Sequence, residues 1–268
     1  MFSENKTVAA AQKIMLEILL EIHRICVENH ITYWLEAGTL LGAIRHKGFI
    51  PWDDDCDVSM PRQDYEKFLK IAQSKLPESM FLQTKETDKD YPLPWAKIRK
   101  NGTLLIETGE TGKENYHHGI FVDIFPYDYY ESADVIKKLQ WERRTKDRKS
   151  LYPKGSLKRA LYGFYANVLL SIPMHAAKKK RKYLIAHRDE LNVKNYSYFS
   201  YAADVGDICI STVNDVLPVK LVENVFEGHS FCIPNKANKL LEASYGLTYM
   251  QLPPVNQRKT HAQKIELN

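Results

Sequence analysis

A run of acidic residues between positions 53 and 57 constrains this chain more than any other feature of its sequence. The run reads Asp53-Asp54-Asp55-Cys56-Asp57 and follows a small-residue turn, Gly38-Thr39, and a basic loop from Arg45 to Ile50. On a strand over residues 53–59, side chains alternate between two faces, so Asp53, Asp55 and Asp57 share one face while Asp54 and Cys56 point to the other. Asp55 and Asp57 then lie roughly 6.6 Å apart along the backbone, close enough to bind one cation between them.

Two interpretations of this run are open. Acidic runs are usually solvated loops, but here Pro51-Trp52 precedes the run and Val58-Ser59-Met60 follows it, which gives it an apolar, strand-like frame. Like charges gathered on one face repel one another unless a cation or a shared proton offsets them. We therefore favour a metal site that holds Mg²⁺, or Mn²⁺ in its place, because both ions prefer oxygen ligands.

The sequence around the run resembles the signature of the LicD family of phosphocholine transferases. Residues 38–57 read Gly-Thr-Leu-Leu-Gly-Ala-Ile-Arg-His-Lys-Gly-Phe-Ile-Pro-Trp-Asp-Asp-Asp-Cys-Asp. Fukutin-related transferases share this signature, and both groups belong to the nucleotidyltransferase-fold superfamily. Cys56 stands where the family usually has Ile or Leu, and Leu247-Thr248 stands where it tends to have Gly-Asp-Tyr. Further similarity lies at residues 60–68, 91–92, 96–99, 118–126, 226–228, 233–235 and 252–261.

The resemblance implies a fold and three acidic site residues. The implied fold is α+β, a nucleotidyltransferase-like mixed sheet flanked by helices. The family match assigns Asp55 and Asp57 directly as catalytic metal ligands. Asp123 is inferred as the third acid from the pattern His-Gly-Ile-Phe-Val-Asp-Ile, where it would share the metal or take the acceptor's proton. A structural bond at a strand end is the alternative role for Asp123.

Phosphate-binding groups are also expected near the acids. Gly38 and Thr39 suit a close approach of backbone amides to a phosphate, because glycine lacks a side chain and threonine offers a hydroxyl. Arginine binds phosphate through two nitrogens, and lysine acts as a point charge. The candidate cations for neutralising a diphosphate are Arg45, Lys47, Lys97 and Arg99. For each of them, a solvated surface role is equally open.

Aromatic and imidazole side chains near these motifs have two possible roles. Trp52, Trp95 and Tyr91 could offer aromatic faces to a quaternary ammonium group, although core packing is the stronger expectation. His117 and His118 precede the third acid and could bind phosphate or donate a proton. A structural role is favoured for both.

Charge is unevenly distributed along the chain, whose net charge is +5. Between Lys137 and Lys194, 17 Lys and Arg residues stand against 4 Asp and Glu, a net +13, and the remainder carries −8. This basic stretch indicates an anionic partner. Residues 160–177 contain no Asp, Glu, Lys or Arg over 18 positions, which just reaches the length of a membrane span, but Gly163, Asn167 and Pro173 interrupt them. We expect this run to be buried or to lie at a membrane surface.

The compartment is inferred from two further features. The four cysteines show no paired spacing, which fits a reducing environment. Residues 8–27 are apolar, but Lys13, Glu17 and Glu21 interrupt them at helical spacing, which predicts an amphipathic helix and not a signal core. Its apolar stripe comprises Val8, Ala11, Met15, Ile18, Ile22 and Ile25. We expect a cytoplasmic protein that contacts the inner face of the cell membrane peripherally.

The predicted organisation has three parts: a catalytic core over residues 1–134, a basic helical insert over 135–225, and a segment over 226–268 that completes the core. Helices are expected over residues 7–28, 38–45, 64–76 and 235–245, and strands over 32–35, 53–59, 81–83, 121–125 and 230–233. Residues 95–100 and 104–107 are expected to form a hairpin around Asn101-Gly102. Helices are expected to dominate residues 133–192, and a Pro-rich loop to end the chain.

Three functions are compatible with these features. The resemblance implies transfer of phosphocholine from CDP-choline to a hydroxyl of a cell-surface glycan of the lipopolysaccharide or teichoic-acid type, or of its lipid-linked precursor, with release of CMP. The second is the same transfer from a CDP-polyol that carries ribitol or glycerol phosphate. The third is a non-catalytic basic protein that binds nucleic acid or anionic lipid. Because the third leaves the acidic run unexplained, no nucleic-acid partner is expected.

Overall fold

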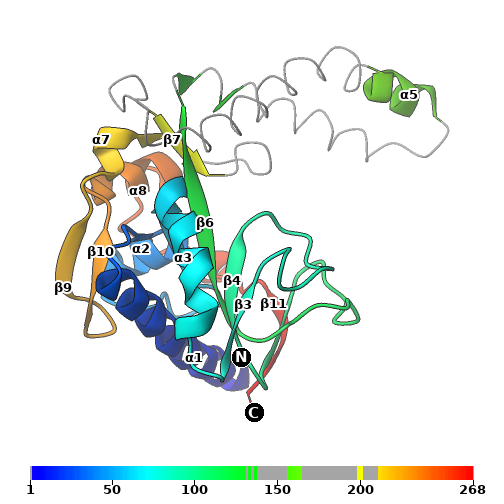
Figure 1. The fold of residues 1–268 in the computed structure, drawn as a ribbon, viewed down its shortest axis with the longest axis horizontal. Coiled ribbons are helices and arrows are strands. Elements are labelled where there is room, and N and C mark those ends of the chain that lie inside the picture. Colours follow the sequence, from blue (N-terminus) through cyan, green and yellow to red (C-terminus); the bar gives the residue numbers. More distant parts are fainter. Residues whose placement is uncertain are drawn as a thin grey trace. The chain divides into compact units, whose positions relative to one another are not determined.

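The computed structural model describes residues 2–130, 132–133, 136–137, 156–164, 198–201 and 211–267. The chain divides into two compact units, one made of residues 1–126 and 215–268 and the other of residues 127–214 (Figure 1). Most of the predicted basic insert, residues 135–225, lies outside the described residues, so its helical character stays a prediction. Residues 215–225 of that range belong to the first unit.

Helices of the first unit carry the apolar patterns expected from the sequence. They are α1 (Phe2–Glu28), α2 (Ala37–Arg45), α3 (Arg62–Lys75) and α8 (Ala237–Tyr245). All six members of the predicted apolar stripe on α1 are buried. α3 begins directly after Pro61, and the extended backbone of Leu76 ends it because the residue before a proline, here Pro77, disfavours helix.

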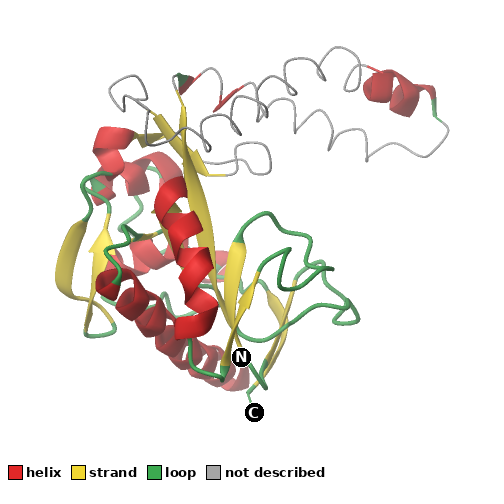
Figure 2. Ribbon diagram, viewed as in Figure 1, coloured by secondary structure: helices red, strands yellow, loops and turns green. Residues whose placement is uncertain are grey.

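One sheet, whose strands are yellow in Figure 2, has the strand order β1-β2-β6-β4-β3. The strands are β1 (Trp34–Leu35), β2 (Asp57–Pro61), β6 (Phe121–Tyr130), β4 (Ala96–Lys100) and β3 (Met80–Gln83). β1 runs antiparallel to β2, and β4 runs antiparallel to both β3 and β6, while the β2–β6 pair makes the sheet mixed. α1 packs against α3 and β4, and α2 packs against β2. The predicted α+β fold with a mixed sheet flanked by helices is confirmed.

The acidic run is not a strand over residues 53–59 as predicted. Residues 53–56 are irregular, and the strand begins only at Asp57. A turn precedes them, in which the backbone N–H of Asp53 donates to the carbonyl of Ile50 at 2.9 Å. All five residues of β2 are buried, in line with its place between β1 and β6. The arrangement of the acids therefore depends on individual side chains and not on strand alternation.

The hairpin predicted around Asn101-Gly102 is wrong in its pairing. A turn does occupy these two residues, with β4 before it and β5 (Leu104–Glu107) after it. However, β3 and β6 occupy both edges of β4, so β5 pairs with β11 (Ala262–Glu266) instead. We had expected the residues of β11 to form a loop. A local turn signal cannot reveal that both edges of one strand are already taken.

The remaining described elements are distributed over the two units. β9 (Lys220–Phe226) and β10 (His229–Ile233) form a hairpin that packs onto α2 and β1. In the second unit, residues 127–130 of β6 pair with β7 (Tyr198–Tyr201), which pairs with β8 (Ser211–Thr212). The short helices are α5 (Leu157–Phe164), α7 (Val213–Val216) and the 3-10 turn η4 (Val255–Gln257).

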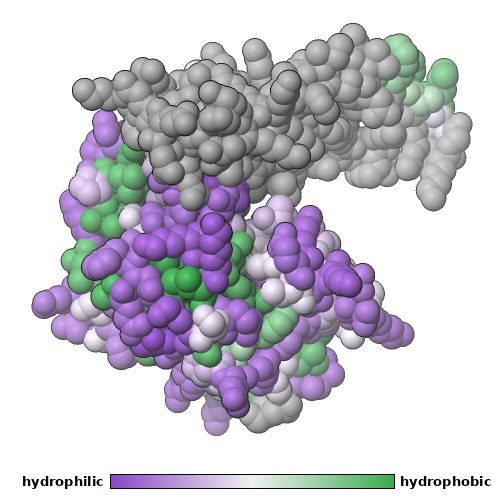
Figure 3. All heavy atoms as spheres, viewed as in Figure 1, coloured by the Kyte–Doolittle hydropathy of each residue, from purple (hydrophilic) through white to green (hydrophobic). Residues whose placement is uncertain are grey.

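Polar and apolar surface are mixed in the described parts. Hydrophilic residues cover most of the coloured surface of the first unit in Figure 3, with smaller hydrophobic patches between them. Among the helices within the described ranges, none combines the length and the hydropathy needed to cross a membrane. Only residues 160–164 of the uncharged run 160–177 fall within these ranges, so the role predicted for the rest is not addressed by the fold.

Candidate active site

The loop that carries the acids is held from three sides. Gln12 of α1 donates from Nε2 to the carbonyls of Ile50 and Asp53, at 2.9 and 2.7 Å. On another side, the β9–β10 turn contributes Glu227, whose Oε1 accepts from the backbone N–H of Phe49 at 2.9 Å. On α2, a Cβ at Gly42 would lie only 2.5 Å from the carbonyl oxygen of the loop residue Gly48, so this close approach requires glycine.

Gly38 and Thr39, at the start of α2, contact the acids directly. A Cβ at Gly38 would come within 2.7 Å of Oδ2 of Asp53, so the missing side chain leaves room for that carboxylate. The hydroxyl oxygen of Thr39 accepts a hydrogen bond from the backbone N–H of Asp57 at 2.8 Å. Both residues therefore shape the acidic loop, and the phosphate contact expected of them stays a prediction.

The predicted acids come together in one electrostatic cluster. Burial, and then the charges of Asp55, Asp123 and Asp53, raise the pKa of Asp57 well above its usual value. Burial, followed by Asp55 and Asp54, likewise raises the pKa of Asp53. Asp57 and Asp123 are 8% and 6% exposed. Several carboxyl groups thus share a poorly solvated region in which ionising all of them is unfavourable.

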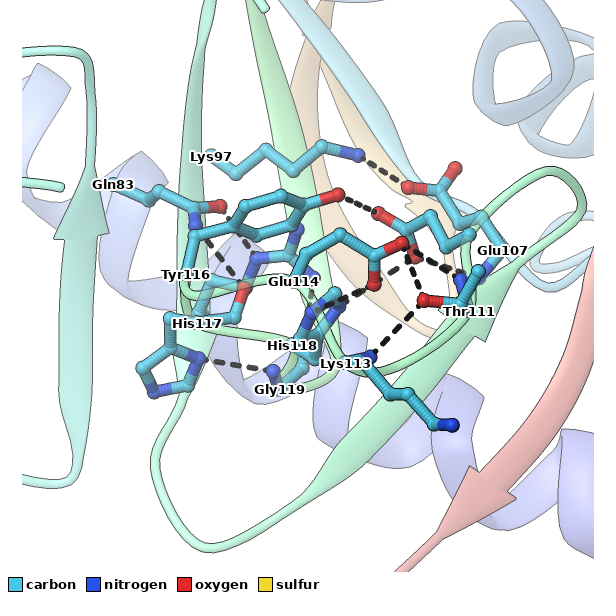
Figure 4. Close-up of polar contacts among 12 residues, drawn as sticks. Gln83, Lys97, Glu107, Thr111, Lys113, Glu114, Tyr116, His117, His118 and Gly119 are labelled. Atoms are coloured by element: carbon cyan, nitrogen blue, oxygen red, sulfur yellow. Dashed lines mark hydrogen bonds and ion pairs between the residues drawn. The ribbon is translucent and has the colours of Figure 1, made fainter. Parts of the chain in front are cut away.

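Asp123, on β6, is held by two donors. The indole Nε1 of Trp95 donates to Oδ1 at 2.8 Å, and Nζ of Lys97 donates to Oδ2 at 3.1 Å. Lys97 also pairs with Oε2 of Glu107 at 3.0 Å, and its ammonium lies 3.3 Å from the centre of the Phe121 ring. Figure 4 shows the Lys97 side chain extending toward Glu107. Burial raises the pKa of Asp123, and the charge of Lys97 opposes that shift.

The four cations proposed for a diphosphate lie in different environments. Lys97 and Arg99 are only 1% and 0% exposed, and Arg99 donates to Gln83 Oε1 and the Gly119 carbonyl. Arg45 donates to the carbonyls of Tyr249 and Gln251 at 2.7 and 3.2 Å. Lys47 is exposed. Lys97 is bonded to Glu107 and Asp123, whereas Nη2 of Arg99 has no hydrogen-bond partner among the described residues, and the phosphate contact expected of both stays a prediction.

His117 and His118 belong to a polar loop between β5 and β6 (Figure 4). Nδ1 of His117 accepts from the backbone N–H of Gly119 at 2.9 Å, and its ring stacks on Phe81. The His118 ring lies between Glu110 and Glu114, at 3.6 and 3.5 Å. These contacts favour the structural role over direct chemistry for both histidines.

The end of the chain reaches the acidic loop, which the sequence reasoning missed. Both carboxylate oxygens of Asp54 accept backbone hydrogen bonds, from His261 at 2.9 Å and from Ala262. Burial alone would raise the pKa of Asp54, but these bonds and the His261 ring lower it. Nδ1 of His261 lies 3.5 Å from an oxygen of Asp54 and 3.5 Å from one of Asp55. The similarity noted at residues 252–261 was the signal that could have placed this segment at the site.

The donor set of the cluster fits a hard divalent cation. Its side-chain donors are carboxylate oxygens, which Mg²⁺ and Mn²⁺ prefer, and the raised pKa values of Asp53 and Asp57 report negative charge that a cation would offset. Within the described residues, the ligand-type atoms found within 4.8 Å of one another belong to Asp53, Asp54 and His261. The predicted ligands Asp55, Asp57 and Asp123 do not form such a group within the described residues, and both Asp123 oxygens, like those of Asp54, already accept hydrogen bonds, so this ligand set stays a prediction.

The aromatic side chains considered for a quaternary ammonium are engaged within the protein. Trp95 donates to Asp123, and Tyr91 is buried at 2% exposure. The guanidinium of Arg258 lies 4.7 Å from the centre of the Trp52 ring. The contacts of Tyr91 and Trp95 therefore favour a structural role for both side chains.

A mixed sheet that brings a Gly-Thr turn, an acidic loop and a third acid on a neighbouring strand together has the arrangement of a nucleotidyltransferase domain. A family model described as "LicD/FKTN/FKRP, nucleotidyltransferase domain" matches residues 30–175, and the chain belongs to this family.

Curated relatives extend this match over nearly the whole chain. The lipopolysaccharide cholinephosphotransferase LicD of Haemophilus influenzae is 31% identical over 259 residues, which is 95% of this chain and 96% of that protein. An uncharacterised protein of Rickettsia prowazekii is 44% identical over 130 residues, 45% of this chain and 47% of that protein. The human ribitol 5-phosphate transferase FKRP is 37% identical over 115 residues, 41% of this chain and 19% of that protein.

Proposed function

We propose that this protein transfers phosphocholine from CDP-choline to a hydroxyl of a cell-surface glycan and releases CMP. The observation that carries the proposal is the similarity to the Haemophilus influenzae cholinephosphotransferase over 95% of the chain, which includes the acidic loop. The clustered carboxyl groups of Asp53, Asp55, Asp57 and Asp123 support metal-dependent phosphoryl chemistry, because such reactions depend on positioning and on neutralising phosphate charge.

In this proposal the acids bind the metal and accept a proton. Asp55 and Asp57 would hold Mg²⁺ or Mn²⁺, which neutralises charge on the donor diphosphate when it is bound, and Asp123 would either share this metal or serve as the base. The acceptor oxygen forms a bond to the phosphorus that carries choline, the bond from that phosphorus to CMP breaks, and the acceptor proton passes to a carboxylate. Asp123 is the candidate base, since Trp95 and Lys97 fix its orientation.

A panel of CDP donors tests this function. Purified protein is incubated with CDP-choline, CDP-ribitol or CDP-glycerol, with Mg²⁺ or EDTA, and CMP is followed by chromatography with and without a glycan acceptor. We expect CMP release that requires CDP-choline, the acceptor and the metal. Absence of release from every donor, under conditions where Asp55→Asn and the parent behave alike, would contradict the proposal.

The second candidate is a CDP-polyol donor, and one observation favours it. The Arg258 guanidinium lies 4.7 Å from the centre of the Trp52 ring, and the Trp95 ring lies 5.1 Å from that of Phe125, so both aromatic rings already have contacts within the protein. A polyol needs hydrogen-bonding partners and not an aromatic cage. The similarity to the human ribitol 5-phosphate transferase is compatible with this donor. In the same panel, release from CDP-ribitol alone would select it.

Peripheral membrane binding forms part of the proposal. On α5, Leu157, Leu161 and Phe164 are 76%, 59% and 63% exposed, and their spacing places them on one face. The region of α5 shows hydrophobic colour in Figure 3. An apolar helix face within a stretch of net charge +13 is the pattern of a segment that lies on an anionic membrane.

Vesicle flotation tests the membrane contact. We expect the protein to float with anionic vesicles more than with neutral ones, less so at high salt, and a Leu161→Glu variant to float less than the parent. A Leu247→Glu variant, which alters an exposed leucine of the first unit, serves as the matched control. Equal and negligible recovery with both vesicle types would rule out membrane binding.

A further inference from the structure

Two contacts hold the side chain of Arg258 beside the acidic loop. Its Nε donates to the carbonyl of Pro253 at 3.0 Å, and its guanidinium carbon lies 4.7 Å from the centre of the Trp52 ring. The guanidinium of Arg258 makes no other hydrogen bond to the described residues. Its two terminal nitrogens, Nη1 and Nη2, therefore have no acceptor among them. Trp52 is the residue directly before Asp53.

Neighbouring contacts place Arg258 within the site. The segment of residues 249–261, which we call the C-terminal segment, is tied to α2 through Arg45, which donates to the Tyr249 and Gln251 carbonyls. Three residues after Arg258, His261 lies 3.5 Å from both Asp54 and Asp55. The charges of Asp53 and of Arg258 both act on the pKa of Arg45, which places each of the two near that guanidinium.

Of the four cations considered for a diphosphate, Lys47 is the one with an exposed side chain. Lys97 and Arg99 are buried and bonded to other residues of the protein, although Nη2 of Arg99 has no hydrogen-bond partner among the described residues, and Arg45 donates to two backbone carbonyls. A metal ion among the acids would meet only part of the charge of a diphosphate. A guanidinium whose Nε is anchored and whose plane lies on an aromatic ring presents its terminal nitrogens at low entropic cost, which suits two-point binding of phosphate.

We propose that Arg258 is a phosphate-binding residue of this site, that it contacts the diphosphate of the cytidine nucleotide donor, and that Trp52 positions it. This inference rests on the proposed function, because it assumes a nucleotide diphosphate substrate. It assigns the C-terminal segment a part in donor binding in addition to its packing on the acidic loop. The alternative is that Arg258 serves as a structural clamp only.

Calorimetric binding of CDP and of cytidine, both with Mg²⁺, tests the proposal. We compare the parent, Arg258→Met, Arg258→Lys and the matched control Lys259→Met, which removes an exposed positive charge one position further on. We expect Arg258→Met to weaken CDP binding roughly tenfold, about 1.4 kcal/mol, without changing cytidine binding. The CDP affinity of Arg258→Lys should lie between those of the parent and of Arg258→Met, because lysine keeps the positive charge and lacks the planar guanidinium. Lys259→Met should bind both compounds like the parent.

The outcomes separate this inference from the proposed function. Parental CDP affinity in Arg258→Met would overturn the inference, as would an equal loss of CDP and cytidine binding, which is the result for a structural clamp. A parent that binds CDP no better than cytidine would overturn it too. If CDP binding depends on Arg258 while no donor yields CMP, the inference stands and the proposed transfer reaction fails.

Discussion

At the scale of single residues, the clustered carboxyl groups that are proposed to bind the metal also destabilise the folded protein by repelling one another. The pKa of Asp57 is raised by burial and then by Asp55, Asp123 and Asp53, so ionising its carboxyl group costs more free energy in the folded state than in the unfolded state. A neutral Asn at this position relieves the repulsion. We therefore expect Asp57→Asn to raise the midpoint of thermal unfolding in EDTA while lowering the transfer rate by on the order of 100-fold.

Thermal unfolding in EDTA and CMP release at saturating Mg²⁺ check this pair of effects. Asp55→Asn should also abolish transfer, and Asp54→Asn should affect it less, because Asp54 is bonded to the backbone of His261 and Ala262. A near-parental rate for Asp57→Asn would show that the predicted two-acid clamp is wrong.

Lys97 provides a second prediction at this scale. Its ammonium is buried between Glu107 and Asp123, and removing one partner from a buried ion pair leaves charge uncompensated. We expect Lys97→Met to lower the free energy of unfolding by roughly 3–5 kcal/mol. The control is Lys100→Met on the same strand, whose ion pair with Glu17 is exposed and should be worth less than about 1 kcal/mol. Urea unfolding of both variants gives the comparison, and equal losses would refute a special role for Lys97.

At the scale of elements, Asp54 ties the last strand to the acidic loop. It accepts the backbone N–H groups of His261 and Ala262, at the start of β11. Without the carboxylate these donors lose their partner, which costs about 1–3 kcal/mol. We expect Asp54→Ala to lower hydrogen-exchange protection in β11 and in its partner β5 while α1 stays protected. Glu266→Gln, on the same strand in an exposed ion pair, should leave protection in place. Unchanged protection in Asp54→Ala would mean that the β5–β11 ladder alone holds the strand.

At the scale of the whole molecule, the two units should respond differently to metal. The predicted ligands Asp55, Asp57 and Asp123 all belong to the unit of residues 1–126 and 215–268. Binding to the folded state alone adds about 2.7 kcal/mol when the free ion is at 100 times its dissociation constant. We expect Mn²⁺ to raise the unfolding temperature of that unit and to leave the unit of residues 127–214 unchanged. Hydrogen exchange during a thermal ramp resolves the units, and a shift that persists in Asp57→Asn would contradict the predicted site.

The sequence by itself determined the features that depend on local pattern. The apolar stripe of α1, the boundaries of α2 and α3, and the grouping of acids beside Gly38-Thr39 follow from side-chain spacing and from short-range preferences of proline and glycine. The family resemblance likewise rests on contiguous residues. Such signals act over a few positions, so they can be read without knowing what packs against them.

Tertiary structure alone decided which distant segments meet. β5 pairs with β11 because both edges of β4 are taken, and no local turn signal contains that information. Lys97 is a buried partner of Asp123, 26 positions away, and not a surface cation. His261 reaches Asp54 across more than 200 positions. Burial and ion pairing depend on the whole chain, because the free energy of a charge is set by the partners and solvent that folding leaves around it.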